Sequence, residues 1–223
     1  MVLRTRELFV RQRGQTANAM RAHMAELGII AATGMTSIAK LILILRDLED
    51  TRLPIAARAA LLEMAEQIET LTARIEKLDT RIVATVKADE TARRLTSIPG
   101  VGPIIAATVR ATIQDPAAFR TGRDLAAWIG ITPRANSSGG KERLGRISKQ
   151  GNKQLRTLLI VGATSILKQA RRGVKLPSWI IALMARRPYK VVAVALANKI
   201  ARTIWALLVK GGTYRAPAIM ARA

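Results

Sequence analysis

A stripe of apolar side chains runs along residues 61–82 in alternating steps of three and four positions. This a/d heptad spacing is typical of a long helix whose narrow apolar seam is covered by another helix. The covering helix belongs either to this chain or to a second copy of it, and we favour pairing that includes self-association. The members of the stripe are Leu61, Met64, Ile68, Leu71, Ile75, Leu78 and Ile82.

Other segments also show helical spacing, and no region shows sustained alternation of apolar and polar residues. The fold class is therefore mainly α, with long coiled-coil-like helices followed by a compact helical domain. Residues 191–209 are long enough to raise the question of a membrane span. Asn198, Lys199 and Arg202 lie at its middle, where charges are costly in hydrocarbon, so we expect a packed terminal helix. The predicted helices cover residues 3–27, 38–48, 153–171, 178–186 and 190–210.

The charge of the chain is unevenly placed. Residues 1–115 carry 16 basic and 13 acidic side chains, whereas residues 116–223 carry 21 and 2. A field of this sign attracts polyanions, of which nucleic acid is the commonest in a cell, with anionic membrane as the rival surface. The chain has no cysteine and only one histidine, His23, so a histidine triad or zinc site is not expected. No signal peptide is evident, and we expect a cytoplasmic protein.

A glycine-rich turn precedes an apolar helix near residue 100. Gly100 and Gly102 flank Val101, and Pro103 suits the first turn of the helix. This pattern has the form of a helix-hairpin-helix, in which amides at the helix N-terminus accept a phosphate without reading a base; an ordinary helix corner is the alternative. Further on, Thr121 and Asp124 form a capping-box pattern for a short helix, with Trp128 expected in the core.

Residues 132–156 gather cations around two serines and two glycines. Ser137 and Ser138 directly precede Gly139 and Gly140, and Glu142 is the only acidic residue in this stretch. A hydroxyl among cations favours phosphate binding or phosphate chemistry. No base stands nearby, so both serines can equally be phosphate ligands or turn formers. The cations are Arg134, Lys141, Arg143, Arg146, Lys149, Lys153 and Arg156.

Three segments in this order carry a family resemblance: LTSIPGVGP at 95–103, DPAAFRTGRDLAAWIGITPR at 115–134 and SSGGKERLGRISKQGN at 137–152. Together they resemble the C-terminal domain of the DEDD insertion-sequence transposases related to the Piv and MooV invertases. The helices before them look like the segment that links this domain to an N-terminal one. The resemblance implies linker helices at 1–90, the transposase domain at 91–170 and a helical extension at 171–223.

The resemblance also implies a chemistry. Members of the family combine a RuvC-like nuclease domain, whose four carboxylates bind divalent metal such as magnesium, with a serine that attacks a DNA phosphodiester. They use a guide RNA and assemble as oligomers. By position, Ser138 is the candidate nucleophile and Ser137 the second choice. From charge and proximity, the cations of residues 132–156 are candidate phosphate contacts, together with Gly100 and Gly102.

The chain departs from the family pattern at its start. Met1 falls inside the linking segment, so we expect an N-terminally truncated transposase with no metal ligands of its own. Its partners would be DNA, guide RNA and, through residues 61–82, a second copy or a full-length transposase. It would be an incomplete enzyme unless that partner supplies the nuclease domain. The alternatives are a non-catalytic helical nucleic-acid-binding protein and a basic protein of the membrane surface.

Overall fold

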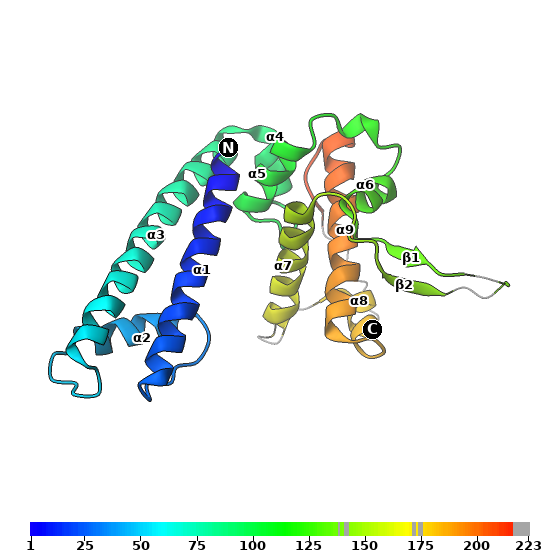
Figure 1. Cartoon of the computed structure of the whole chain (residues 1–223). Coiled ribbons are helices and arrows are strands. Elements are labelled where there is room, and N and C mark those ends of the chain that lie inside the picture. Colours follow the sequence, from blue (N-terminus) through cyan, green and yellow to red (C-terminus); the bar gives the residue numbers. More distant parts are fainter. Residues whose placement is uncertain (138, 141–142, 171–172, 174–175, 216–223) are drawn as a thin grey trace. The chain divides into compact units, whose positions relative to one another are not determined.

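A computed structural model shows a mainly α chain with one small β-hairpin, as the fold class predicts (Figure 1). The structure describes residues 1–137, 139–140, 143–170, 173 and 176–215. The chain forms two compact units, Met1–Ile82 and Val83–Ala223. The boundary lies inside one long helix, eight residues before the division that we expected at residue 90, and the segment after residue 170 lies in the second unit.

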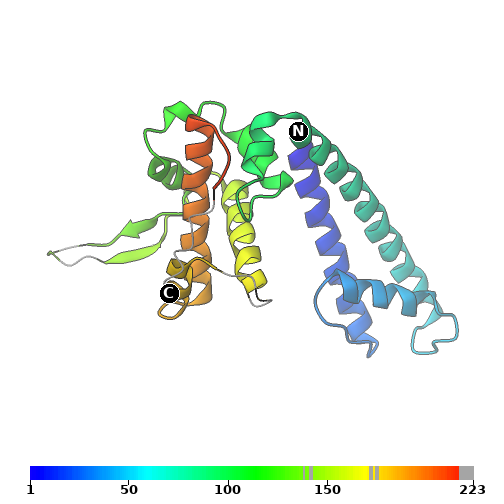
Figure 2. The ribbon, with the colours of Figure 1, turned by 180° about the vertical axis from the view of Figure 1, so that it is seen from behind.

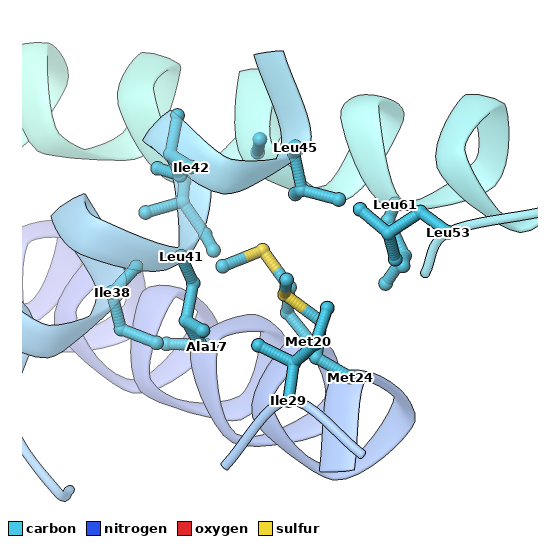
Figure 3. Packing of buried hydrophobic residues seen from close by; sticks show 12 residues of the cluster. Ala17, Met20, Met24, Ile29, Ile38, Leu41, Ile42, Leu45, Leu53 and Leu61 are labelled. Carbon is cyan, nitrogen blue, oxygen red and sulfur yellow. The ribbon is translucent and has the colours of Figure 1, made fainter. Parts of the chain in front are cut away.

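The first unit consists of α1 (Val2–Glu26), α2 (Met35–Arg46) and most of α3 (Ile55–Ala88). Figure 3 shows its core, in which Met20 and Met24 of α1 lie among aliphatic side chains of α2 and of the loops. Leu41 and Leu45 supply the α2 side of this cluster, and Ile68 the α3 side. Burial of side chains of this size stabilises the fold by about 2 kcal/mol each.

The apolar stripe of α3 is covered inside the chain. Its buried members are at most 3% exposed, and only Met64 and Leu78 are half-buried. Both ribbon views show α1 lying along α3 (Figures 1 and 2), and the Arg6 guanidinium pairs with Asp79 between these helices. Of the two covering helices that we considered, one from the same chain and one from a second copy, the first therefore accounts for the stripe. The stripe gives no independent argument for self-association.

Arg58 holds the end of α2 and the loop after it through hydrogen bonds to backbone carbonyls. The loop from Asp47 to Asp50 follows the end of α2. The Arg58 guanidinium, on a residue only 9% exposed, donates to the carbonyls of Leu45 at 2.7 Å and Asp50 at 2.6 Å, and to that of Asp47. These are C-terminal carbonyls of a helix and loop carbonyls that would otherwise lack donors.

The second unit is built around its last helix, α9 (Tyr189–Lys210), which packs against α6 (Gly122–Ile129) and α7 (Lys153–Ala170). Its other helices are α4 (Glu90–Leu95), α5 (Pro103–Thr112), the 3-10 helix η1 (Pro116–Ala118) and α8 (Ser178–Met184). By length and composition α9 could cross a membrane. Its buried residues, from Val192 to Leu207, instead form the centre of this unit, as in a packed core helix.

Two local predictions near α6 have different outcomes. The capping box is confirmed, because the Thr121 hydroxyl accepts from the Asp124 amide and the Asp124 carboxylate accepts from the Thr121 amide. The expectation that Trp128 lies in the core is wrong. Its side chain is 41% exposed and contacts the edge of Phe119, because it occupies the outer face of a short helix whose inner face is formed by Leu125 and Ile129.

Candidate nucleic-acid interface

The cation-rich segment folds as a β-hairpin, although no region of the sequence shows the alternation of apolar and polar residues that predicts strands. Strand β1 (Pro133–Ala135) pairs antiparallel with β2 (Leu144–Ile147), with an irregular register between its two ends. The Asn136 amide continues the pairing by donating to the Arg143 carbonyl at 2.7 Å. Both ribbon views show the hairpin projecting from the helices of its own unit (Figures 1 and 2). Most of its side chains are therefore exposed to solvent.

Glycines fix the root of the hairpin. Gly130 ends α6 in the left-handed conformation, with φ of 80°, and a Cβ there would lie 1.8 Å from the Gln150 carbonyl oxygen. Gly151, with φ of 82°, faces the Trp128 carbonyl, which would lie 1.7 Å from its Cβ. Only glycine allows the two backbones to approach this closely in this conformation.

Arg156 ties the same root together from α7. Its Nη1 donates to the Ile129 carbonyl at 2.9 Å and to the Gln150 carbonyl at 3.0 Å, and the side chain is half-buried. We predicted Arg156 as a nucleic-acid contact. The structure shows that its guanidinium already positions the end of α6 against the chain that leaves the hairpin.

The other described cations of the segment remain available to a ligand. Arg134 donates to the Ser148 carbonyl at 3.2 Å, a bond that leaves its charge uncompensated. Within the described part of the chain, no ion pair engages any of these cations. An exposed projection that carries uncompensated cations is suited to polyanion binding. The exposed cations are Arg134, Arg143, Arg146, Lys149 and Lys153; Lys141, also predicted, lies outside the described residues.

Ser137 lies on the hairpin with its hydroxyl directed to the backbone. Its Oγ accepts a hydrogen bond from the Arg143 amide at 3.2 Å, and the residue is exposed. Gly139 and Gly140 follow with φ of 58° and 74° and open space around each. The predicted nucleophile Ser138 lies outside the described residues. No bond from the Ser137 hydroxyl to a base occurs among the residues that the structure describes.

The two glycines of the predicted phosphate-binding turn play different parts. Gly100 packs against α7, since a Cβ there would lie 2.8 Å from the Gly162 carbonyl oxygen. Its need for glycine is thus explained by helix packing and by its φ of 80°. Gly102 is the N-cap of α5, is exposed and has open space around it. Of the two, only Gly102 is placed where a phosphate could approach.

Metal ligands were not expected in this chain. Across the described ranges, no three histidine, cysteine or acidic side chains lie close enough together to hold a metal ion. The resemblance assigns the magnesium ion to the carboxylates of a nuclease domain, and no such set lies among these described residues.

Two cations of α9 that were not predicted as ligand contacts lie in a cleft of the second unit. Lys199 and Arg202 of α9 line a cleft with Trp179 of α8. In the sequence, two cations three positions apart in a region almost without acidic residues could have indicated this site.

The second unit contains a segment that is similar to a known protein family. Residues 92–175 match the sequence profile of the transposase IS116/IS110/IS902 family. The chain is 43% identical over 217 residues to a protein named as a candidate transposase, y4pF/y4sB, of Sinorhizobium fredii, covering 96% of this chain and 56% of that protein.

Two further relatives align over almost the whole chain. One, from Pseudomonas aeruginosa and named probable family 20 transposase, is 42% identical over 214 residues, which are 95% of this chain and 63% of the relative. The other, named transposase for insertion sequence element IS1111A, of Coxiella burnetii, is 36% identical over 215 residues, 96% of this chain and 59% of the relative. The chain thus spans about three fifths of the length of these curated relatives.

Proposed function

We propose that this chain binds the DNA of an insertion sequence and takes part in its transposition, because residues 92–175 match the transposase IS116/IS110/IS902 family. Three relatives named as transposases align with nearly all of the chain, which supports this proposal. The observation that carries it is the exposed hairpin, whose cations have no acidic partner in the described structure.

The hairpin cations would contact phosphates, and such contacts set register and affinity without reading bases. Each neutralised phosphate of duplex DNA steepens the dependence of log K on log salt by about 0.9. Replacing Arg143 and Arg146 together by Gln should therefore weaken DNA binding similarly for all sequences and reduce the salt slope by about 1.8.

A matched control exists outside the hairpin. Arg186 and Arg187 are also exposed, adjacent cations of the same unit, and changing both to Gln alters the net charge equally. The two double variants are compared by fluorescence anisotropy with labelled duplex DNA over a salt series. Equal losses of DNA affinity for both pairs would mean that the hairpin cations contribute no more to binding than other exposed cations of the unit.

The serine chemistry is the finer part of the proposal and rests on the resemblance. The Oγ of Ser138, or of Ser137, would attack a DNA phosphorus. An Oγ–P bond forms, one ester P–O bond breaks, and a deoxyribose hydroxyl leaves with the electron pair and a proton. The serine proton must pass to a base, and arginines of the hairpin would stabilise the charge on the phosphoryl oxygens.

The partners that the resemblance implies belong to the same proposal. A full-length transposase would supply the nuclease domain with its divalent metal, and a guide RNA would supply sequence recognition. The burial of the α3 stripe leaves the proposed assembly no free apolar seam at residues 61–82 in this fold. A second chain would therefore use another face.

Covalent trapping on junction DNA of the element tests the chemistry. The chain is assayed alone and with a full-length relative plus guide RNA, as wild type, Ser138→Ala and Ser137→Ala. We expect a protein–DNA adduct on this chain only in the mixture, and its loss in Ser138→Ala but not in Ser137→Ala. DNA binding without an adduct in any mixture would leave a binding protein and refute the catalytic role.

A further inference from the structure

A second cationic site lies on the second unit, away from the tip of the hairpin. A cleft of about 610 Å3 is lined by the start of α6 at Gly122, by one face of α9 and by Trp179 of α8. Both ribbon views place α6 and α8 beside α9 (Figures 1 and 2). A cleft of this volume is large enough for a small organic ligand.

The cations of the cleft have no acidic partner among the residues that the structure describes. Lys199 and Arg202 are exposed on α9, and neither forms an ion pair within the described ranges. Among the residues that the structure describes, no acidic side chain lines the cleft, and Asp124, two positions after Gly122 on α6, is held by the capping box. Two uncompensated cations in a concave site favour an anionic ligand.

An aromatic ring accompanies these cations. The Nζ of Lys199 lies 4.6 Å from the centre of the Trp179 ring, and Trp205 lines the same cleft. The indole of Trp205 is fixed by a hydrogen bond of 3.0 Å to the Phe119 carbonyl. Aromatic rings next to cations are the usual components of sites for unpaired nucleotides, because bases contact the rings while phosphates contact the cations.

The cleft is connected to the root of the hairpin. Asn198, another residue of its lining, donates to the Ile131 carbonyl, at 3.4 Å, just before β1 begins. A nucleic acid that lies along the hairpin could thus continue toward the cleft. We propose that this cleft binds an unpaired nucleotide of single-stranded nucleic acid, with Lys199 and Arg202 at its phosphates and Trp179 beside its base. This inference rests on the proposed function, since it takes the second unit to be a nucleic-acid-binding unit.

Binding of labelled single strands to the full chain tests the site. Oligonucleotides of about twelve nucleotides, one of dT and one of U, are titrated by anisotropy, so that DNA and RNA are distinguished. The test variant is Lys199→Gln with Arg202→Gln. Its matched control, Lys190→Gln with Lys210→Gln, removes the same charge from exposed positions near the two ends of α9. We expect a loss of about tenfold for the test pair and of less than about threefold for the control.

Tryptophan fluorescence gives a second readout that charge alone would not change. Stacking of a base should quench Trp179, so the quenching by the single strand should be much smaller in Trp179→Phe than in Trp128→Phe, with Trp205 of the same cleft giving any remaining quenching. Equal losses for the two charge pairs, or quenching as large in Trp179→Phe as in Trp128→Phe, would overturn the proposal. Displacement of the strand by a glutamate-rich peptide as effectively as by unlabelled strand would also overturn it, and would indicate an acidic protein partner.

The outcome for the cleft variants can be distinguished from the outcome for the hairpin variant. The Arg143 and Arg146 variant tests duplex binding, whereas the cleft variants should lose single-strand binding and keep duplex binding within about threefold. Loss of duplex binding in the hairpin pair with no effect of the cleft pair on single strands would refute this inference alone. Melting curves by circular dichroism verify that each variant is folded.

Discussion

The three arginines that form ion pairs in the first unit and the arginines of the hairpin have opposite surroundings. In the first unit, Arg6 pairs with Asp79, Arg46 with Glu69 and Arg52 with Asp50. On the hairpin, Arg143 and Arg146 are exposed and have no ion pair in the part of the chain that the structure describes. The same residue type thus stabilises the fold in one region and leaves its charge available in the other.

The distribution of acids explains this difference. The 13 acidic residues before position 116 are close in number to the 16 basic ones, whereas only Asp124 and Glu142 accompany the 21 cations that follow. Cations that have partners contribute to stability, and cations without partners contribute to the field that attracts a polyanion. Substitution of single arginines can measure which of these two roles each one has.

Arg58 should show the largest effect on stability. Arg58→Ala removes the donor to several buried or half-buried carbonyls at the end of α2, so the free energy of unfolding should fall by about 3 kcal/mol. Chemical denaturation followed by circular dichroism measures it. Lys40→Ala, at an exposed position of α2, is the control, with an expected change within about 0.5 kcal/mol. A loss below about 1 kcal/mol for Arg58→Ala would contradict a structural role.

Arg156 should come second, and it distinguishes positioning from ligand contact. Arg156→Ala frees the Ile129 and Gln150 carbonyls, so we expect a loss of about 2 kcal/mol in the stability of the second unit. Its neighbour Lys153, exposed on the same helix, should cost less than about 0.5 kcal/mol when changed to Ala. If Arg156→Ala instead weakened DNA binding and left the melting temperature unchanged, Arg156 would be a direct contact.

The two regions also differ in how well the sequence predicts them. The stripe of α3 and the capping box at Thr121 follow from local spacing, and both are present in the structure. The hairpin could not be predicted in this way, because its strands are three and four residues long and largely exposed, so no buried face imposes alternation. The root depends on contacts between residues far apart in sequence, such as Gly130 with Gln150, which spacing does not reveal.

The candidate site shows the same limit. Composition located the cationic segment, and chemistry identified its serines, but neither could separate Arg156, which holds backbone carbonyls, from Arg143, which is exposed. Similarly, Gly100 and Gly102 look equivalent in the sequence. Only the packing of Gly100 on Gly162 shows that one glycine serves the fold.

Replacing Asp89 should have a smaller effect on the free energy of unfolding, and this effect should depend on pH. The Arg110 guanidinium, whose Nε lies 2.9 Å from Asp89 Oδ2, and the Ala92 amide lower the pKa of this carboxyl. Because the folded pKa lies below the unfolded one, the contribution is fully present above the unfolded pKa and is lost as pH falls through the folded value. Asn retains the helix cap but removes the charge, so Asp89→Asn should cost less than about 1 kcal/mol at neutral pH, given the partial exposure of both partners.

Unfolding of wild type and Asp89→Asn is measured at neutral pH and at several pH values below the ordinary aspartate pKa of about 3.9. The difference between the two proteins should shrink as the pH falls through the lowered pKa of Asp89. A difference that does not change with pH would assign the effect to the geometry of the cap instead of the ion pair.

The hairpin pair should have the smallest effect on stability, and this gives the sharpest test of the comparison. Arg143→Gln with Arg146→Gln removes two exposed cations that have no acidic partner in the described structure, so the free energy of unfolding should change by less than about 0.5 kcal/mol. Relief of repulsion among like charges could even raise it slightly. A loss as large as that expected for Arg58→Ala would show that these arginines also hold the fold together. Unchanged stability together with weaker DNA binding would instead establish that these two arginines contribute to DNA binding and not to the stability of the fold.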